Sequence, residues 1–162
     1  MDTIQDKKQV RVMLVNPPQK IYTHAWNSGL YFPVGLLYVA AVIRDICTLK
    51  ILDCMIDDFM IEKCDGYELQ GTPQKKIEES IKEFQPDIVG ISIPFTAQSD
   101  NGINICKTVK RILPETIVVL GGPDPSIRFE FLLQNSPADF CVVGEGEETF
   151  PEIIDNHAKG KK

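Results

Sequence analysis

The stretch DIVGISI at residues 87–93 decides the fold expected for this chain. It is almost continuously apolar, with Pro86 before it and Pro94 after it. A strand with one face in water alternates apolar and polar residues, whereas a strand of a parallel sheet covered on both faces is apolar throughout. The run therefore predicts a buried strand. The run IVVL at 117–120, followed by Gly-Gly-Pro at 121–123, predicts a second strand of the same kind.

Outward from these two runs, three more strands and five helices are predicted in alternation. The strands are VRVMLV at 10–15, LKIL at 49–52 and FCVV at 140–143. Apolar residues spaced three or four apart predict helices at 35–47, 72–84, through 105–113, at 124–133 and around 150–154. Two of these helices are expected to begin at a polar cap followed by proline, Thr72-Pro73 and Asp124-Pro125. The alternation predicts a three-layer α/β sandwich, a five-stranded parallel sheet with helices on both faces.

Apolar context gives two expectations about burial. The helix at 35–47 carries Leu37 and Val42 beside its main apolar stripe, so it is expected to be mostly buried. Cys47, Cys106 and Cys141 lie in apolar segments and are expected to be small buried side chains.

Length and composition predict one domain of ordinary globular type. The 162 residues divide into a flexible N-terminus at 1–9, a domain at 10–155, and a tail or start of a linker at 156–162. A net charge of −6 disfavours a nucleic-acid surface. The polar N-terminus has no signal-peptide pattern, and no apolar run approaches the roughly 20 residues of a membrane span, so a cytoplasmic location is expected.

Glycine, proline and short hydroxyl residues follow four of the five predicted strands. Ligands of open parallel sheets bind beyond the carboxyl ends of the strands, where glycine lets the backbone approach a bulky ligand and hydroxyls form hydrogen bonds. Any single turn also needs such residues for its own geometry, but the four together favour a ligand site. The candidate binding residues are Asn16, Pro17, Pro18, Ser92, Ile93, Pro94, Phe95, Thr96, Gly121, Gly122, Pro123, Val143, Gly144, Glu145, Gly146 and Glu147.

Five segments carry a family resemblance. They are VNPP at 15–18, FPVGLLYVAA at 32–41, PDIVGIS at 86–92, VLGGP at 119–123 and ADFCVVGEGEETF at 138–150. This ordered set resembles the N-terminal cobalamin (B12)-binding domain of cobalamin-dependent radical S-adenosylmethionine enzymes, over nearly the whole chain. The resemblance implies a flavodoxin-like (Rossmann-like) fold that binds cobalamin, with Ser92 and Gly121-Gly122 at the places that hold its nucleotide tail.

One departure from the wider group of cobalamin-binding proteins concerns the cobalt. Many of those proteins have Asp-x-His-x-x-Gly after the first strand, and the histidine binds cobalt from below; here residues 16–21 read NPPQKI. The resemblance therefore implies cobalamin bound base-off, without a protein histidine or any other metal ligand from this chain. His24 lies in an aromatic segment at 22–32 and is not expected to bind cobalt. For this segment two alternatives stay open: Tyr22, Trp26 and Tyr31 pack on the corrin or on a catalytic domain, or the segment is disordered in the isolated chain.

The catalytic core implied by the resemblance is missing from the sequence. A radical core would hold its [4Fe–4S] cluster with C-x-x-x-C-x-x-C, and no such spacing occurs among the five cysteines. No catalytic residues are predicted. We expect the cluster and S-adenosylmethionine in an absent catalytic domain or a partner, in the same longer chain or in trans. Methyl transfer is the expected reaction, with a cyclisation as the other option.

Three alternatives stay open. A dinucleotide-binding domain would place Asp53 on a ribose, but the first turn lacks Gly-x-Gly-x-x-Gly. A phosphorylated receiver domain would use Asp53 as acceptor, but the paired acids after the first strand and the lysine after the last are absent. The third is a vestigial or protein-interaction domain that has kept the fold and lost cobalamin.

Overall fold

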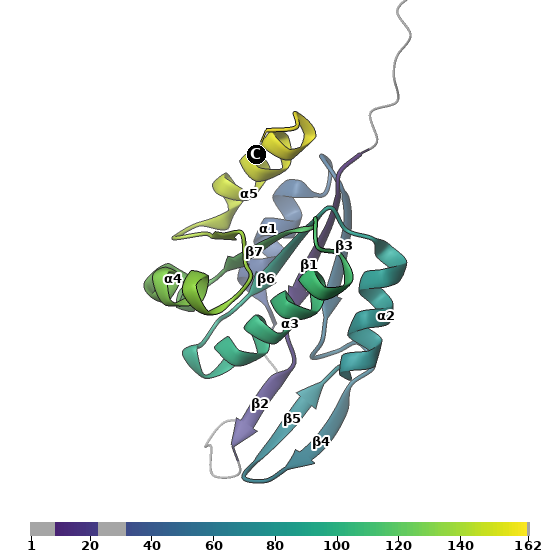
Figure 1. Cartoon of the computed structure of the whole chain (residues 1–162), viewed down its shortest axis with the longest axis vertical. Helices are drawn as coiled ribbons and strands as arrows, with labels where there is room; N and C mark the ends of the chain where they lie inside the picture. Colours follow the sequence, from purple (N-terminus) through teal and green to yellow (C-terminus); the bar gives the residue numbers. More distant parts are fainter. Residues whose placement is uncertain (1–8, 23–31, 162) are drawn as a thin grey trace, which may run out of the picture.

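The computed structural model describes residues 9–22 and 32–161. Its main sheet contains five parallel strands in the order β3-β1-β6-β7-β8 (Figure 1). Counted along the chain within this sheet, the order is 2-1-3-4-5, that of flavodoxin-like folds. The predicted three-layer α/β fold is confirmed. The strands are β1 (Arg11–Asn16), β3 (Thr48–Asp53), β6 (Ile88–Ser92), β7 (Ile117–Gly121) and β8 (Phe140–Cys141).

Five helices cover the two faces of this sheet and bury one apolar cluster on each. On one face, α2 (Gln74–Phe84), α3 (Ser99–Ile112) and α4 (Pro123–Asn135) pack against side chains such as Met13, Ile91 and Leu120. On the other face, α1 (Val34–Ile43) and α5 (Gly146–Ala158) pack against Val12, Leu14 and Val119. Figure 1 shows α1 behind the sheet and α3 in front of it. A short 3-10 helix, η1 (Thr96–Gln98), precedes α3.

A second, three-stranded antiparallel sheet was not expected from the sequence. Its order is β2-β5-β4, formed by Gln19–Tyr22, Tyr67–Gly71 and Met60–Cys64. In Figure 1 it extends from the end of the main sheet where β1 finishes. The Gln98 side chain links the two parts, because its Oε1 accepts from Lys20 N at 3.0 Å and its Nε2 donates to Lys20 O at 3.3 Å.

Two helices begin at residues other than those predicted, and the predicted capping side chains form other hydrogen bonds. The α2 helix begins at Gln74, and the Thr72 hydroxyl donates to the carbonyls of Cys54 and Asp57. The α4 helix begins at Pro123, and the Asp124 carboxylate accepts hydrogen bonds from the side chains of Thr96 in η1 and Ser99 at the start of α3. Neither N-terminus has a side-chain cap. In α4 the prolines of the first turn lack an N–H, so donors that a cap would satisfy are absent there.

Three further expectations need correction. The α1 helix is not mostly buried, since Leu37 is 42% exposed, Val42 is 45% exposed and Tyr38 is 61% exposed. The last strand ends at Cys141 and not at Val143, because the chain turns at Gly144, whose φ is +84°. Cys47 and Cys106 are buried as predicted, but Cys141 is only half-buried, and Cys54 is the additional buried thiol. The predicted boundaries at 10 and 155 remain predictions.

Candidate functional site

A cavity of about 580 Å³ lies at the carboxyl ends of the main-sheet strands. Its walls come from the ends of β1, β6 and β7, from the loops that follow β6, β7 and β8, and from the starts of α1 and α5. Parallel strands bring these turns to one edge of the sheet, although they are far apart in the sequence. The volume lies within the usual range of small-molecule sites.

Most of the candidate residues meet at this cavity. Those that line it lie at the end of a strand or in the segment that follows it, and they are Asn16, Ser92, Pro94, Phe95, Gly121, Gly122, Pro123, Gly144, Glu145, Gly146 and Glu147. The end of β1 and the turns after β6, β7 and β8 therefore border one cavity, and the role of these residues in binding stays a prediction.

Five candidates do not line the cavity. Pro17 and Pro18 are buried where β1 passes into β2. Ile93 is fully buried in the cluster under α3, with its carbonyl accepting from Asp124 N at 3.3 Å. The Thr96 hydroxyl donates to Asp124 Oδ1 at 2.7 Å. Val143 is 57% exposed beyond the end of β8.

Sequence reasoning missed the apolar floor of the cavity. The missed residues belong mainly to the α1 and α5 face and are Leu14, Gln19, Phe32, Pro33, Val34, Gly35, Leu36, Val39, Gly90, Ile91, Val119, Ser126, Val142 and Phe150. Gly90 gave a local signal, since a glycine inside an apolar strand often marks a close approach by another group. The residues from Phe32 to Val39 lie in a segment that carries the family resemblance, but no local pattern placed them at the cavity.

Gly90 shapes this floor by leaving room for an aromatic ring. A Cβ at this position would lie 2.7 Å from Leu14 Cδ2 and 2.8 Å from Phe150 Cε2. Leu14 on β1 and Val119 on β7 pair directly with Gly90. The ring of Phe150, on α5, therefore rests where a larger residue would stand, and the bottom of the cavity is apolar.

The two glycines at the end of β7, Gly121 and Gly122, have different roles. Gly122 has a φ of +110°, and a Cβ there would come within 2.9 Å of Ile93 O, so the turn needs glycine. Gly121 lines the cavity, and a Cβ there would meet nothing within 4 Å. Backbone at Gly121 is thus open to a ligand, while Gly122 lets the β7 turn pass close to the loop after β6.

A buried polar network fixes the loop after β6 against the start of α4. The Asp124 carboxylate accepts from Thr96 Oγ1 at 2.7 Å and from Ser99 Oγ at 2.6 Å, and it lies 2.9 Å from Arg128 Nε. Arg128 also donates to Ser99 Oγ at 3.0 Å. Because the Asp124 side chain is almost fully buried, these partners compensate for its lost hydration. The network holds one wall of the cavity in place.

Ser126 connects two other parts of the wall. Its hydroxyl donates to Gly122 O at 3.0 Å and accepts from Gly144 N at 3.1 Å. The turn after β7 and the loop after β8 are therefore joined by one side chain that itself lines the cavity.

The Asn16 side chain at the edge of the cavity is held by Asp53. Asn16 Nδ2 donates to Asp53 Oδ1 at 2.7 Å, and the same oxygen accepts from Met55 N at 3.0 Å. The carboxylate that the dinucleotide and receiver alternatives require is thus engaged in fixing the ends of β1 and β3.

The ionisable side chains that line the cavity differ in type from those of the packed interior. Among the described residues, the ionisable side chains that line the cavity are Glu145 and Glu147, and no Lys, Arg, His or Cys joins them. Burial raises the pKa of Cys54 and of Cys106 to about 12, so both thiols stay protonated at neutral pH.

Within 9–22 and 32–161, no three His, Cys, Asp or Glu side chains are grouped to hold a metal ion. No described helix is long and apolar enough to cross a membrane.

An apolar floor, open backbone and a hydrogen-bonding rim fit a large neutral ligand. The B12-binding domain family model matches residues 28–154, which include most of this rim. The chain belongs to the B12-binding domain family.

Relatives of known sequence agree with this assignment. An uncharacterized methyltransferase of Pyrococcus horikoshii is 31% identical over 156 residues, which are 96% of this chain and 31% of that protein. Cytidylyl-2-hydroxyethylphosphonate methyltransferase of Streptomyces wedmorensis is 30% identical over 151 residues, 90% of this chain and 28% of that protein. The chain thus spans about 30% of the length of these relatives.

Solved structures share the fold. A cobalamin-binding protein from Desulfitobacterium hafniense has a TM-score of 0.56 at 18% identity, covering 91% of this chain and 60% of that one. A response-regulator receiver domain from Bacteroides fragilis also has a TM-score of 0.56, at 14% identity, covering 92% of this chain and 97% of that one. At such low identity these similarities concern the fold alone, and the family assignment rests on the sequence match.

Proposed function

We propose that this chain binds cobalamin at the cavity and presents it to a radical S-adenosylmethionine catalytic core that the chain itself does not contain. The observation that carries the proposal is the convergence of four strand ends, those of β1, β6, β7 and β8, on one cavity, in a chain of the B12-binding domain family. The expected cytoplasmic location belongs to the same proposal.

The described residues fit cobalamin in two ways. The apolar floor formed by Leu14, Gly90 and Phe150 suits the aromatic base of the nucleotide tail. The open backbone at Gly121 and the hydroxyl of Ser92 suit its polar linkage, since both offer hydrogen-bonding groups at the cavity wall. When bound, cobalamin supplies a cobalt centre that carries a methyl group, a chemistry no protein side chain has.

We further propose the base-off form without a histidine on cobalt. In the described part of the chain no histidine lines the cavity, and the turn after β1 consists of buried prolines. His24 lies outside the described residues, as do Trp26 and Tyr31, so the expectations for that segment remain predictions. Electron paramagnetic resonance of the cobalt(II) protein is expected to show no nitrogen splitting; a nitrogen triplet would contradict the proposal.

Methyl transfer is the reaction we propose for the assembled enzyme. The two relatives named above are called methyltransferases, and about 70% of their length lies outside the region matched here. That remainder has room for a [4Fe–4S] cluster and S-adenosylmethionine. We expect the C-x-x-x-C-x-x-C motif in the coding sequence around this gene. Its absence from the neighbouring reading frames would leave the chain without the proposed partner.

A second candidate function is a protein-interaction domain without a cofactor. It is favoured by the outer side of α1, where Leu37, Tyr38 and Val42 are exposed on a helix that has no charged residue. Hydroxocobalamin separates the two functions. Desalted protein is expected to retain about one cobalamin per chain, whereas a domain that has lost the site would elute colourless.

A further inference from the structure

Two carboxylates stand at the rim of the cavity, both at the start of α5. Glu145 is the residue before the helix, Glu147 lies in its first turn, and both line the cavity. In the described part of the chain neither side chain forms an ion pair, and no Lys, Arg or His lines the cavity to balance them. The rim is therefore negative where a ligand enters.

The same segment also presents hydrogen-bond donors. The first N–H groups of a helix have no partner within the helix, and no side chain caps the start of α5. Gly146 brings this helix start close to α1, since a Cβ there would lie 2.9 Å from Val39 Cγ2. Backbone donors and carboxylate acceptors thus lie together at one wall of the cavity.

A primary carboxamide matches this combination, and a carboxylate does not. The carbonyl oxygen of an amide accepts hydrogen bonds and its NH₂ group donates two, so a carboxamide can use both kinds of partner. A ligand carboxylate only accepts, and it adds a negative charge beside two others in a partly enclosed site. Cobalamin carries neutral carboxamides around its corrin ring, whereas its biosynthetic and hydrolysed relatives carry carboxylates.

We propose that Glu145 and Glu147 determine specificity, selecting a corrinoid whose edge bears carboxamides and rejecting one whose edge bears carboxylates. The proposal rests on the proposed function, because it requires that the cavity binds cobalamin. Acidic residues in the first turn also favour the helix dipole, and that role alone would affect stability without affecting the choice of ligand.

The test compares hydroxocobalamin with its monocarboxylic acids, in each of which one peripheral propionamide has been hydrolysed. Equilibrium dialysis at low salt is expected to show at least one acid isomer bound about tenfold more weakly than hydroxocobalamin by the wild-type chain. In the double variant E145Q/E147Q the ratio should fall to about twofold, because the repulsion is removed. Raising the salt concentration should narrow the wild-type ratio as well, since ions screen exposed charges.

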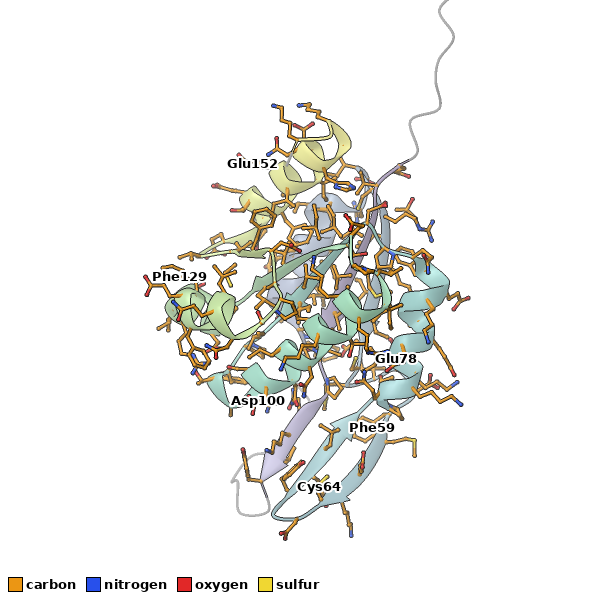
Figure 2. All side chains as sticks on the ribbon, in the orientation of Figure 1. Phe59, Cys64, Glu78, Asp100, Phe129 and Glu152 are labelled. Carbon is orange, nitrogen blue, oxygen red and sulfur yellow. The ribbon has the colours of Figure 1, made fainter. Side chains whose placement is uncertain are left out.

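Glu152 provides a matched control on the same helix. It is exposed, does not line the cavity and is labelled on α5 in Figure 2. E152Q removes the same charge and should keep the wild-type ratio. Equal binding of all isomers by the wild type, or equal ratios in E145Q/E147Q and E152Q, would overturn the specificity role. Failure of the wild type to retain hydroxocobalamin itself would instead overturn the proposed function, and the specificity proposal with it.

Discussion

On one face of the main sheet, Ile81, Ile91 and Ile105 belong to a continuous apolar cluster beneath α2, α3 and α4. On the other face, α1 and α5 lie over Leu14, Gly90 and Val119, and a cavity remains between them at the carboxyl end of the strands. Both faces are built from the same strands, because successive side chains of a strand point to opposite sides. We call the face beneath α2, α3 and α4 the closed face, and the face beneath α1 and α5 the open face.

The difference between the faces comes from a few residues rather than from overall hydrophobicity. Gly90 contributes no side chain to the open face, and the same strand contributes Val89 and Ile91 to the closed face. The outer sides of the helices do not separate the faces, since α1 exposes Leu37 and Tyr38 and α4, on the closed face, exposes Ile127. Stability should therefore depend mainly on the closed face and ligand binding on the open face.

Truncation on the closed face should produce the largest effect. Ile81 is fully buried there, and Ile81→Ala should lower the free energy of unfolding by about 4 kcal/mol, because it removes packed methyl groups and leaves a void. Leu36→Ala is the control on the open face, and it should cost about 2 kcal/mol since Leu36 already borders the cavity. Urea denaturation measures both; equal losses would contradict the distinction between the faces.

Filling the open face should separate binding from stability. Gly121→Leu adds a side chain where a Cβ meets nothing within 4 Å, so the free energy of unfolding should stay within about 0.5 kcal/mol of wild type. Affinity for hydroxocobalamin should fall about 100-fold, or about 2.8 kcal/mol. Ala41→Leu adds the same bulk on the exposed side of α1 and should leave binding unchanged. Binding that survives Gly121→Leu would place the cofactor elsewhere.

Overpacking the floor of the cavity should affect stability moderately. Gly90→Ala places a Cβ within 2.8 Å of both Leu14 and Phe150, so it should destabilise the fold by about 2 kcal/mol. Phe150→Leu in the same chain makes room for the new methyl group. The double variant is expected to lose less than the sum of the two single losses in thermal or urea unfolding. Strict additivity would show that Gly90 does not serve to accommodate the ring.

The main sheet was predictable because local signals agree with its tertiary role. Runs such as DIVGISI are apolar throughout, and Gly or Pro follows them where the chain must turn. The small sheet was not predictable, since strands such as QKIY at 19–22 and YELQG at 67–71 are short and half-exposed. Their pairing joins positions nearly fifty residues apart, and no local pattern specifies that contact.

The rim of the candidate site was predictable for the same reason, and its floor was not. Turn residues such as Gly121 and Gly144 differ in type from a buried core, so the sequence marks them. Leu14, Val119 and Phe150 are ordinary core residues, and only the strand register and the position of α5 show that they border a cavity. The exposed side of α1 was mispredicted because an apolar helix normally indicates burial on every side.

The last expected effect concerns the two thiols of the closed face, and it is confined to alkaline pH. Burial raises the pKa of Cys54 and Cys106 to about 12, so the folded chain keeps protons that the unfolded chain loses above about pH 8.5. The free energy of unfolding should therefore fall between about pH 9 and 12, by up to about 1.4 kcal/mol per pH unit for each thiol, with no contribution below about pH 8. Urea denaturation from pH 7.5 to 10.5 under reducing conditions measures this slope. Cys106→Ala should be less stable than wild type at pH 7.5 but show a shallower alkaline decline, because one of the two thiols is gone. Parallel declines in the two proteins would mean that solvent reaches this thiol, and that the closed face is less tightly packed than its burial indicates.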